Sequence, residues 1–180
     1  MRQFVLAVAM MLSSTAQSQM LSDFMPPAQV RFIKAAQEYE EKYKAAENEL
    51  QKSSLWKQRT KAILAATKPL GNEKKGKWVG IIDEMGTTGK GNAYIKVMIT
   101  ESMSLATWNN EFSDGGIGSL IKMDSPDFDV LATLKKGSVI KFSPAIDVNG
   151  QAMTEHGKMV SPKFITKFKQ IEVITGASGG

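Results

Sequence analysis

Apolar and polar side chains alternate strictly between Asn92 and Thr100. The apolar set is Ala93, Ile95, Val97 and Ile99, and the intervening set is Tyr94, Lys96 and Met98. A period of two predicts a β-strand with one buried and one exposed face, because successive side chains of a strand point to opposite sides. The chain must therefore build a sheet that buries one of its faces.

Further strands are predicted on both sides of this segment. They are Lys77–Ile82, Ser104–Trp108, Ser138–Ser143 and Lys163–Ile174, with a short edge piece at Gly118–Ile121. Gly86, Gly89 and Gly91 predict a hairpin loop between the first two strands, and Asn149-Gly150 a later turn. Ser125-Pro126-Asp127 is a helix start, with Phe128, Leu131 and Leu134 as its buried face and Lys135-Lys136-Gly137 as its end. The predicted order is three strands, one helix and two strands.

That order is typical of the OB-fold, a five-stranded Greek-key barrel. Several segments carry the pattern: Trp78-Val79-Gly80, the Ala93–Ile99 strand, the run from Leu131 to Ser143, and Pro162-Lys163-Phe164 with Phe168. In these segments the chain resembles bacterial exported OB-fold proteins, in particular the tRNA-anti-like OB-fold family. The resemblance covers residues 77–174 and implies a barrel of that type, with nucleic-acid binding only by analogy of fold. We expect residues 77–174 to fold alone as this barrel.

A long helical segment, residues 20–67, precedes the barrel. After Pro26-Pro27, no proline or glycine occurs between Ala28 and Thr67, and good helix formers dominate. Side chains spaced alternately by four and three form a stripe: Phe32, Ala36, Tyr39, Tyr43, Ala46 and Leu50. Ser53-Ser54 is the point where a break or bend is expected. The stripe favours either contact with a second chain or packing on the chain's own barrel, and both alternatives stay open. Overall we expect an α+β chain, mainly β, in which one long N-terminal helix precedes the barrel.

The first nineteen residues have the pattern of a secretory signal peptide. Arg2 gives a positive start, an apolar run extends from Phe4 to Leu12, and small or polar residues follow to Gln19. The apolar run is shorter than the ~20 residues that span a bilayer. We therefore expect an exported protein, periplasmic or secreted, with no membrane span after signal removal. Residues 68–76 read as a linker and residues 175–180 as a disordered tail.

Composition narrows the chemistry. The chain has no cysteine, one histidine and a formal net charge of +5. Disulfides, thiol nucleophiles and zinc–thiolate sites are therefore excluded. The Gly89-Lys90 pair lacks the glycine and hydroxyl residue that a phosphate-binding loop places around it. No nucleophile-elbow sequence surrounds any serine, Ser161 included, and His156 and Asp147 have no evident catalytic partner. Asp114, Asp124, Asp127 and Asp129 lack the spacing of a calcium loop. We predict no metal, no cofactor and no enzymatic activity, with a hydrolase that uses only carboxylates as a weaker alternative.

Two surfaces of the expected barrel are candidates for binding. The first is the outer face of its second and third strands, where OB-folds bind extended ligands; its candidate residues are Tyr94, Lys96, Met98, Trp108, Asn109 and Asn110. The second is a basic patch of Lys141, Lys163, Lys167 and Lys169, whose lysines alternatively only protect a sheet edge.

The sequence therefore predicts a non-catalytic binding or assembly module of the bacterial cell envelope. It would contact a protein partner, or a second copy of itself, through the N-terminal helix and barrel surface. The alternative is an OB-fold that binds single-stranded nucleic acid or an oligosaccharide on the face of its second and third strands.

Overall fold

The computed structural model of the chain describes residues 21–68, 70, 76–146 and 159–174. The predicted signal peptide, most of the linker, the Asn149-Gly150 turn, Asp147, His156 and the C-terminal tail lie outside these residues. Within them the fold is α+β, with a closed five-stranded barrel and several helices.

The barrel strands are β1 (Trp78–Thr87), β2 (Ala93–Met98), β3 (Ser104–Ala106), β4 (Val139–Ile146) and β5 (Lys163–Val173). They close in the order β1-β2-β3-β5-β4, and β1 pairs with β4. Every pairing is antiparallel except the one between β3 and β5, which is parallel. The predicted edge piece contributes one bridge, between Ile121 and Ala93.

The alternation predicted for the second strand is confirmed. Ala93, Ile95 and Val97 are buried, whereas Tyr94, Lys96 and Met98 are partly exposed. The buried set joins apolar side chains of the other strands in one core. Because β2 pairs with β1 on one side and β3 on the other, its exposed face lies between those two strands.

The prediction of one long N-terminal helix is wrong, because this segment forms a hairpin of two helices. They are α2 (Pro27–Lys44) and α3 (Glu49–Ala66). The break lies at residues 45–48, not at Ser53-Ser54, which is inside α3. Asn48 begins α3 by accepting a hydrogen bond from the Gln51 N–H at 3.0 Å, and the Gln51 side chain accepts one from the Glu47 N–H at 2.8 Å. These bonds satisfy N–H groups at the start of the new helix.

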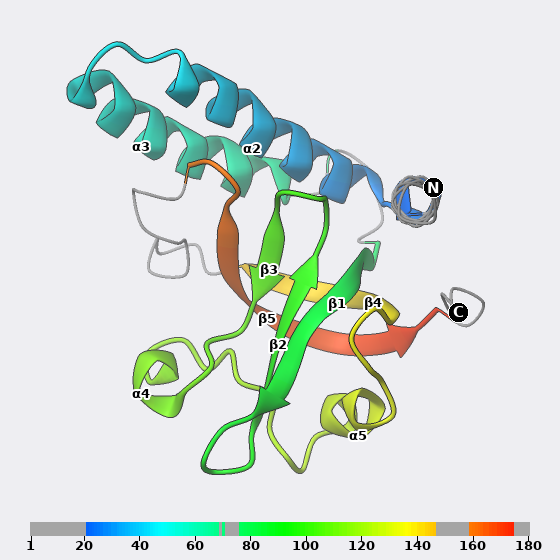
Figure 1. The fold of residues 1–180 in the computed structure, drawn as a ribbon. Coiled ribbons are helices and arrows are strands. Elements are labelled where there is room, and N and C mark those ends of the chain that lie inside the picture. Colours follow the sequence, from blue (N-terminus) through cyan, green and yellow to red (C-terminus); the bar gives the residue numbers. More distant parts are fainter. Residues whose placement is uncertain (1–20, 69, 71–75, 147–158, 175–180) are drawn as a thin grey trace, which may run out of the picture.

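The helical hairpin lies across one end of the barrel (Figure 1). Phe32 of α2 is fully buried and packs edge-on against Trp78 of β1 and Phe164 of β5, with ring centroids 4.9 and 5.2 Å apart. The buried Gln29 side chain donates to the Val79 carbonyl at 2.7 Å and accepts from the Val79 N–H at 2.8 Å. A helix side chain thus pairs with the backbone of β1 much as a neighbouring strand would.

Two short helices, α4 (Glu111–Asp114) and α5 (Pro126–Ala132), lie at the other end (Figure 1). α5 begins as predicted, with the Ser125 hydroxyl accepting from the Phe128 N–H at 3.3 Å. Asp127 then accepts the Ile171 N–H of β5 at 2.7 Å, which fixes α5 to the barrel. The one-turn helix α4 was not predicted, so the segment between β3 and β4 holds two helices rather than one.

Candidate functional site

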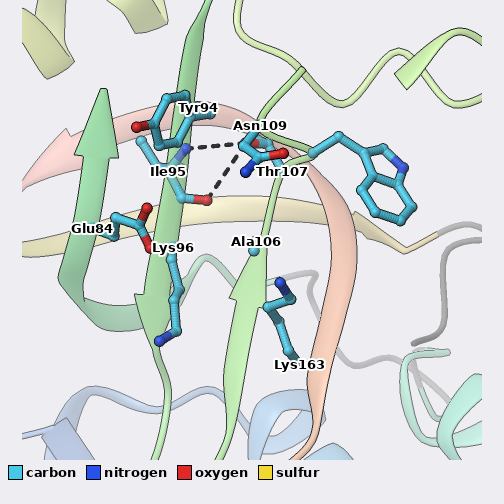
Figure 2. A pocket seen from close by; sticks show the side chains of 9 residues that line it. Glu84, Tyr94, Ile95, Lys96, Ala106, Thr107, Asn109 and Lys163 are labelled. Atoms are coloured by element: carbon cyan, nitrogen blue, oxygen red, sulfur yellow. Dashed lines mark hydrogen bonds between the residues drawn. The ribbon is translucent and has the colours of Figure 1, made fainter. Parts of the chain in front are cut away.

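A small open cleft lies on the outer face of β2 and β3. Its volume is about 90 Å³, and its lining residues are Glu84, Tyr94, Ile95, Lys96, Ala106, Thr107, Trp108, Asn109 and Lys163 (Figure 2). Four of the six residues predicted to bind a ligand are among them, as is one lysine of the predicted basic patch. The cleft is smaller than the ~150 Å³ cavity that encloses benzene. A bound group would therefore rest on the surface rather than be enclosed.

Tyr94 lies across Gly86, its register partner on β1. A Cβ at residue 86 would come within 2.5 Å of the Tyr94 Oη and 2.6 Å of its Cζ. Only glycine leaves room for the ring in this position. Figure 2 shows the phenol reaching from β2 toward β1, with the side chains of Lys96 and Lys163 on the same face of the barrel.

Lys96 is already engaged by a carboxylate. A β-bulge in β1 between Ile82 and Glu84 inserts Asp83 as an extra residue. The Asp83 carboxylate lies 2.7 Å from Lys96 Nζ and 3.1 Å from Lys136 Nζ. Hydrogen bonds from Lys96, and then from Lys136, lower the pKa of Asp83. Glu84 stands opposite Lys96 in the ladder and is the carboxylate that lines the cleft itself.

The other wall forms where the chain leaves β3. Thr107 donates its N–H to the Ile95 carbonyl, and its hydroxyl accepts the Ile95 N–H, both at 3.0 Å (Figure 2). The Trp108 N–H then donates to the Ser119 hydroxyl at 2.9 Å. The buried Asp114 accepts hydrogen bonds from both the N–H and the hydroxyl of Ser119, at 2.5 and 2.6 Å. This wall is therefore held by side-chain bonds rather than by a continuing strand.

Lys163 reaches the cleft through a pairing that sequence reading missed. It opens β5 and is the register partner of Ser104 in the parallel β3–β5 ladder. The predicted basic patch is dispersed along the sheet. Lys167 lies near Gly118, whereas Lys141 lies opposite Glu172 and its Nζ is 5.3 Å from the Phe24 ring centroid. Lys169 is exposed opposite Ser143.

Two predicted ligand residues do not line the cleft. Met98 lies at the end of β2 opposite Ser104. Asn110 is the N-cap of α4, where its side chain accepts the Ser113 N–H at 2.8 Å. Conversely, Glu84 does line the cleft, although it lies beyond Ile82, the predicted end of the first strand. Extension of β1 to Thr87 brings Glu84 onto the sheet.

The predicted helix stripe is divided by its surroundings. Phe32 and Ala36 are fully buried within the chain itself, so their side chains are not available to a partner in this conformation. Tyr39, Tyr43 and Ala46 are half-buried, and Leu50 at the turn of the hairpin is 85% exposed. Lys42 lies over the Tyr39 ring at 4.8 Å, and Lys52 over that of Tyr43 at 5.7 Å. Only the distal half of the stripe faces outward.

The four aspartates considered as metal ligands either hold structural hydrogen bonds or are exposed. Asp114 holds the turn after α4, Asp127 fastens α5, and Asp124 and Asp129 are exposed. Among the described residues, no three histidine or acidic side chains gather as a metal site would require. In that same part of the chain, no helix is both long and apolar enough to cross a membrane.

The shallow cleft thus brings a tyrosine, an amide, two lysines and a glutamate together on one face of the barrel. Such a set can stack on a ring and exchange hydrogen bonds with polar groups. Comparison with protein-family models, with curated proteins and with solved structures finds no match for this chain.

Proposed function

We propose that the chain is a non-catalytic binding module of the bacterial cell envelope, whose ligand occupies the β2–β3 cleft of an OB-like Greek-key barrel. One observation carries this proposal. The fold gathers Tyr94 and Lys96 of β2 with Trp108 and Asn109 of the loop after β3 around one cleft, and adds Lys163 of β5 to them. The first two residues of the predicted helix stripe, Phe32 and Ala36, are by contrast buried inside the chain.

The strand order supports the OB-like assignment. A closed barrel of five strands in the order β1-β2-β3-β5-β4, with α5 between β3 and β4, agrees with the element order from which the sequence resemblance was drawn. OB-folds bind oligonucleotides and oligosaccharides on the face of strands 2 and 3 and on adjacent loops. The cleft lies on that face. A small, open cleft of this kind suits one unit of an extended ligand.

A binding panel tests the proposal. The purified protein is titrated with neutral and acidic oligosaccharides and with single-stranded oligonucleotides, by calorimetry or fluorescence anisotropy. Tyr94→Ala and Lys163→Ala should each weaken binding of the true ligand by about tenfold, the loss of roughly 1.4 kcal/mol. Lys61→Ala, an exposed position on α3, is the control. Equal affinities for all four proteins would refute the cleft as the site.

The export of the protein is part of the proposal and rests on residues 1–19. We propose a periplasmic or secreted location, with the mature chain starting near Gln17 or Gln19. N-terminal sequencing of the protein recovered from its host tests this. Material that remains cytoplasmic and retains Met1 would refute it.

Assembly through the helical hairpin is a second candidate function, favoured by the distal part of the stripe. Leu50, at the turn of the hairpin, is 85% exposed, and Ala46 and Tyr43 are half-buried. An exposed leucine at such a turn is suited to contact with a second copy or a protein partner. Light scattering of the native protein and of a Tyr43→Glu, Leu50→Glu double variant tests self-association. If both are monomeric, the hairpin does not self-associate, and only contact with a different protein remains as its function.

A further inference from the structure

The outer surface of the barrel has a place where an aromatic ring rests on a glycine. The Tyr94 ring lies across Gly86, and a Cβ at residue 86 would fall 2.5–2.9 Å from three atoms of the phenol. Both residues belong to the outward set of the β1–β2 ladder. Because residue 86 has no side chain, the Tyr94 ring lies directly on the strand and still forms part of the cleft wall.

The charges around this ring are nearly balanced. Lys96 lies 2.7 Å from the Asp83 carboxylate, which also pairs with Lys136 at 3.1 Å, so the charge of Lys96 is partly compensated. Lys163 and Glu84 also line the cleft and carry opposite charges. A polyanion gains affinity by having its charges neutralised by lysine or arginine. Here it would have to compete with Asp83 for Lys96 and would meet the Glu84 carboxylate. The balance favours an uncharged ligand.

The polar groups that remain are suited to hydroxyls. Glu84 only accepts hydrogen bonds, Lys163 only donates them, and the Asn109 amide does both. A sugar hydroxyl can act in either sense, and the C–H face of a pyranose carries the slight positive charge that an aromatic face attracts. An uncharged sugar therefore matches both the ring and its polar border.

We propose that Tyr94, seated on Gly86, is a stacking platform for one pyranose ring of a neutral oligosaccharide. Glu84, Asn109 and Lys163 are the partners of its hydroxyls. Gly86 is a positioning residue, since it acts only through the ring of Tyr94. This inference rests on the proposed binding function of the cleft and selects the oligosaccharide from the two ligand classes considered there.

Two glycine variants separate positioning from general damage. Gly86→Ala adds a methyl group that must push the far end of the Tyr94 side chain away. Gly89→Ala, in the same hairpin, meets nothing within 4 Å. Tyr94→Phe keeps the ring, and Tyr94→Ala removes it. Folding is verified for each by thermal unfolding, and the ring-current shift of the Hα resonance at residue 86 reports whether the ring is seated.

The full chain and these variants are applied to a glycan array of neutral and acidic oligosaccharides, and to a dT12 oligonucleotide. We expect neutral glycans to bind with less than a twofold change in affinity between 50 and 500 mM NaCl. Tyr94→Ala and Gly86→Ala should each lower the affinity for neutral glycans at least tenfold. The affinities of Gly89→Ala and Tyr94→Phe should stay within threefold of that of the native protein.

The other outcomes overturn the inference in distinguishable ways. Salt-sensitive binding of dT12 or of acidic glycans alone would overturn the assignment of a neutral sugar and leave the binding function standing. Neutral-glycan binding that weakens in Lys163→Ala but not in Tyr94→Ala or Gly86→Ala would refute only the stacking role of Tyr94. Failure of every ligand to bind would overturn both the inference and the proposed function.

Discussion

Val97 shows how sharply the barrel separates its two faces within a single strand. Its side chain is fully buried and its register partners are Ile82 on β1 and Leu105 on β3. Val97→Asp places a charge among apolar neighbours and should lower the free energy of unfolding by at least about 4 kcal/mol. Lys96→Gln, at the next position, should cost under about 1 kcal/mol, since it removes only a surface ion pair. Urea denaturation measures both, and equal midpoints would contradict the assignment of faces.

Asp83 gives the chain a specific response to acid. Its pKa is lowered by hydrogen bonds from Lys96 and Lys136, so the unfolded chain binds a proton at this site more readily than the folded chain. The resulting stabilisation is present above the ordinary aspartate pKa and is lost as the pH falls through the lowered one. Asp83→Asn should therefore flatten the dependence of stability on pH below about 4, where the ordinary aspartate pKa lies. Asp124→Asn, at an exposed position, is the control. Parallel stability profiles for Asp83→Asn and the native chain would contradict this.

At the scale of elements, the strands and α5 were predictable because their signals are local. The alternation around Val97 and the cap at Ser125 each depend on a few consecutive residues. The break between α2 and α3 was missed because the stripe keeps its spacing through Tyr43, Ala46 and Leu50. The usable signal was Asn48 followed three residues later by Gln51, a capping pattern.

The candidate site was predictable only in part, because only some of its residues are marked by a local pattern in the sequence. Tyr94 and Lys96 follow from the alternation of one strand. Lys163 enters through the parallel pairing of β3 with β5, which joins positions far apart in the chain and leaves no local pattern. Asp83 compensates Lys96 only because of a bulge, and nothing in the spacing of residues 78–87 specifies one.

Gln29 is the side chain that fixes α2 to the barrel. It is fully buried, and its amide occupies both the N–H and the carbonyl of Val79. Gln29→Leu leaves two buried backbone groups without partners and should cost about 2–6 kcal/mol, at roughly 1–3 kcal/mol for each such group. Gln37→Leu, on the exposed side of the same helix, should be nearly neutral. Hydrogen exchange at the Val79 amide should rise by more than tenfold in the first variant only; unchanged protection would show that this bond does not hold the helix.

The whole molecule has a principal core that both parts of the chain build. Phe32, Ile33 and Ala36 of α2 and Ile63 of α3 belong to the same buried cluster as Trp78 and Phe164 of the barrel. Removing the hairpin would expose the two aromatic rings and free the Val79 backbone groups. Residues 77–174 on their own would therefore lose part of their core, contrary to the expectation from sequence that they fold alone. We predict that hairpin and barrel unfold as one cooperative unit.

Phe32→Ala tests this coupling without cutting the chain. The substitution removes a fully buried ring from between Trp78 and Phe164 and should cost about 3–5 kcal/mol. If hairpin and barrel form one unit, the loss lowers the urea midpoint of both together. Far-ultraviolet circular dichroism follows the helices, and the fluorescence of a variant that keeps Trp78 as its only tryptophan follows the barrel. Coincident transitions, shifted equally by Phe32→Ala, are expected. Helices that unfold at lower urea than an unshifted barrel would instead mean that the barrel is stable alone and that the hairpin is an appendage free to open toward a partner.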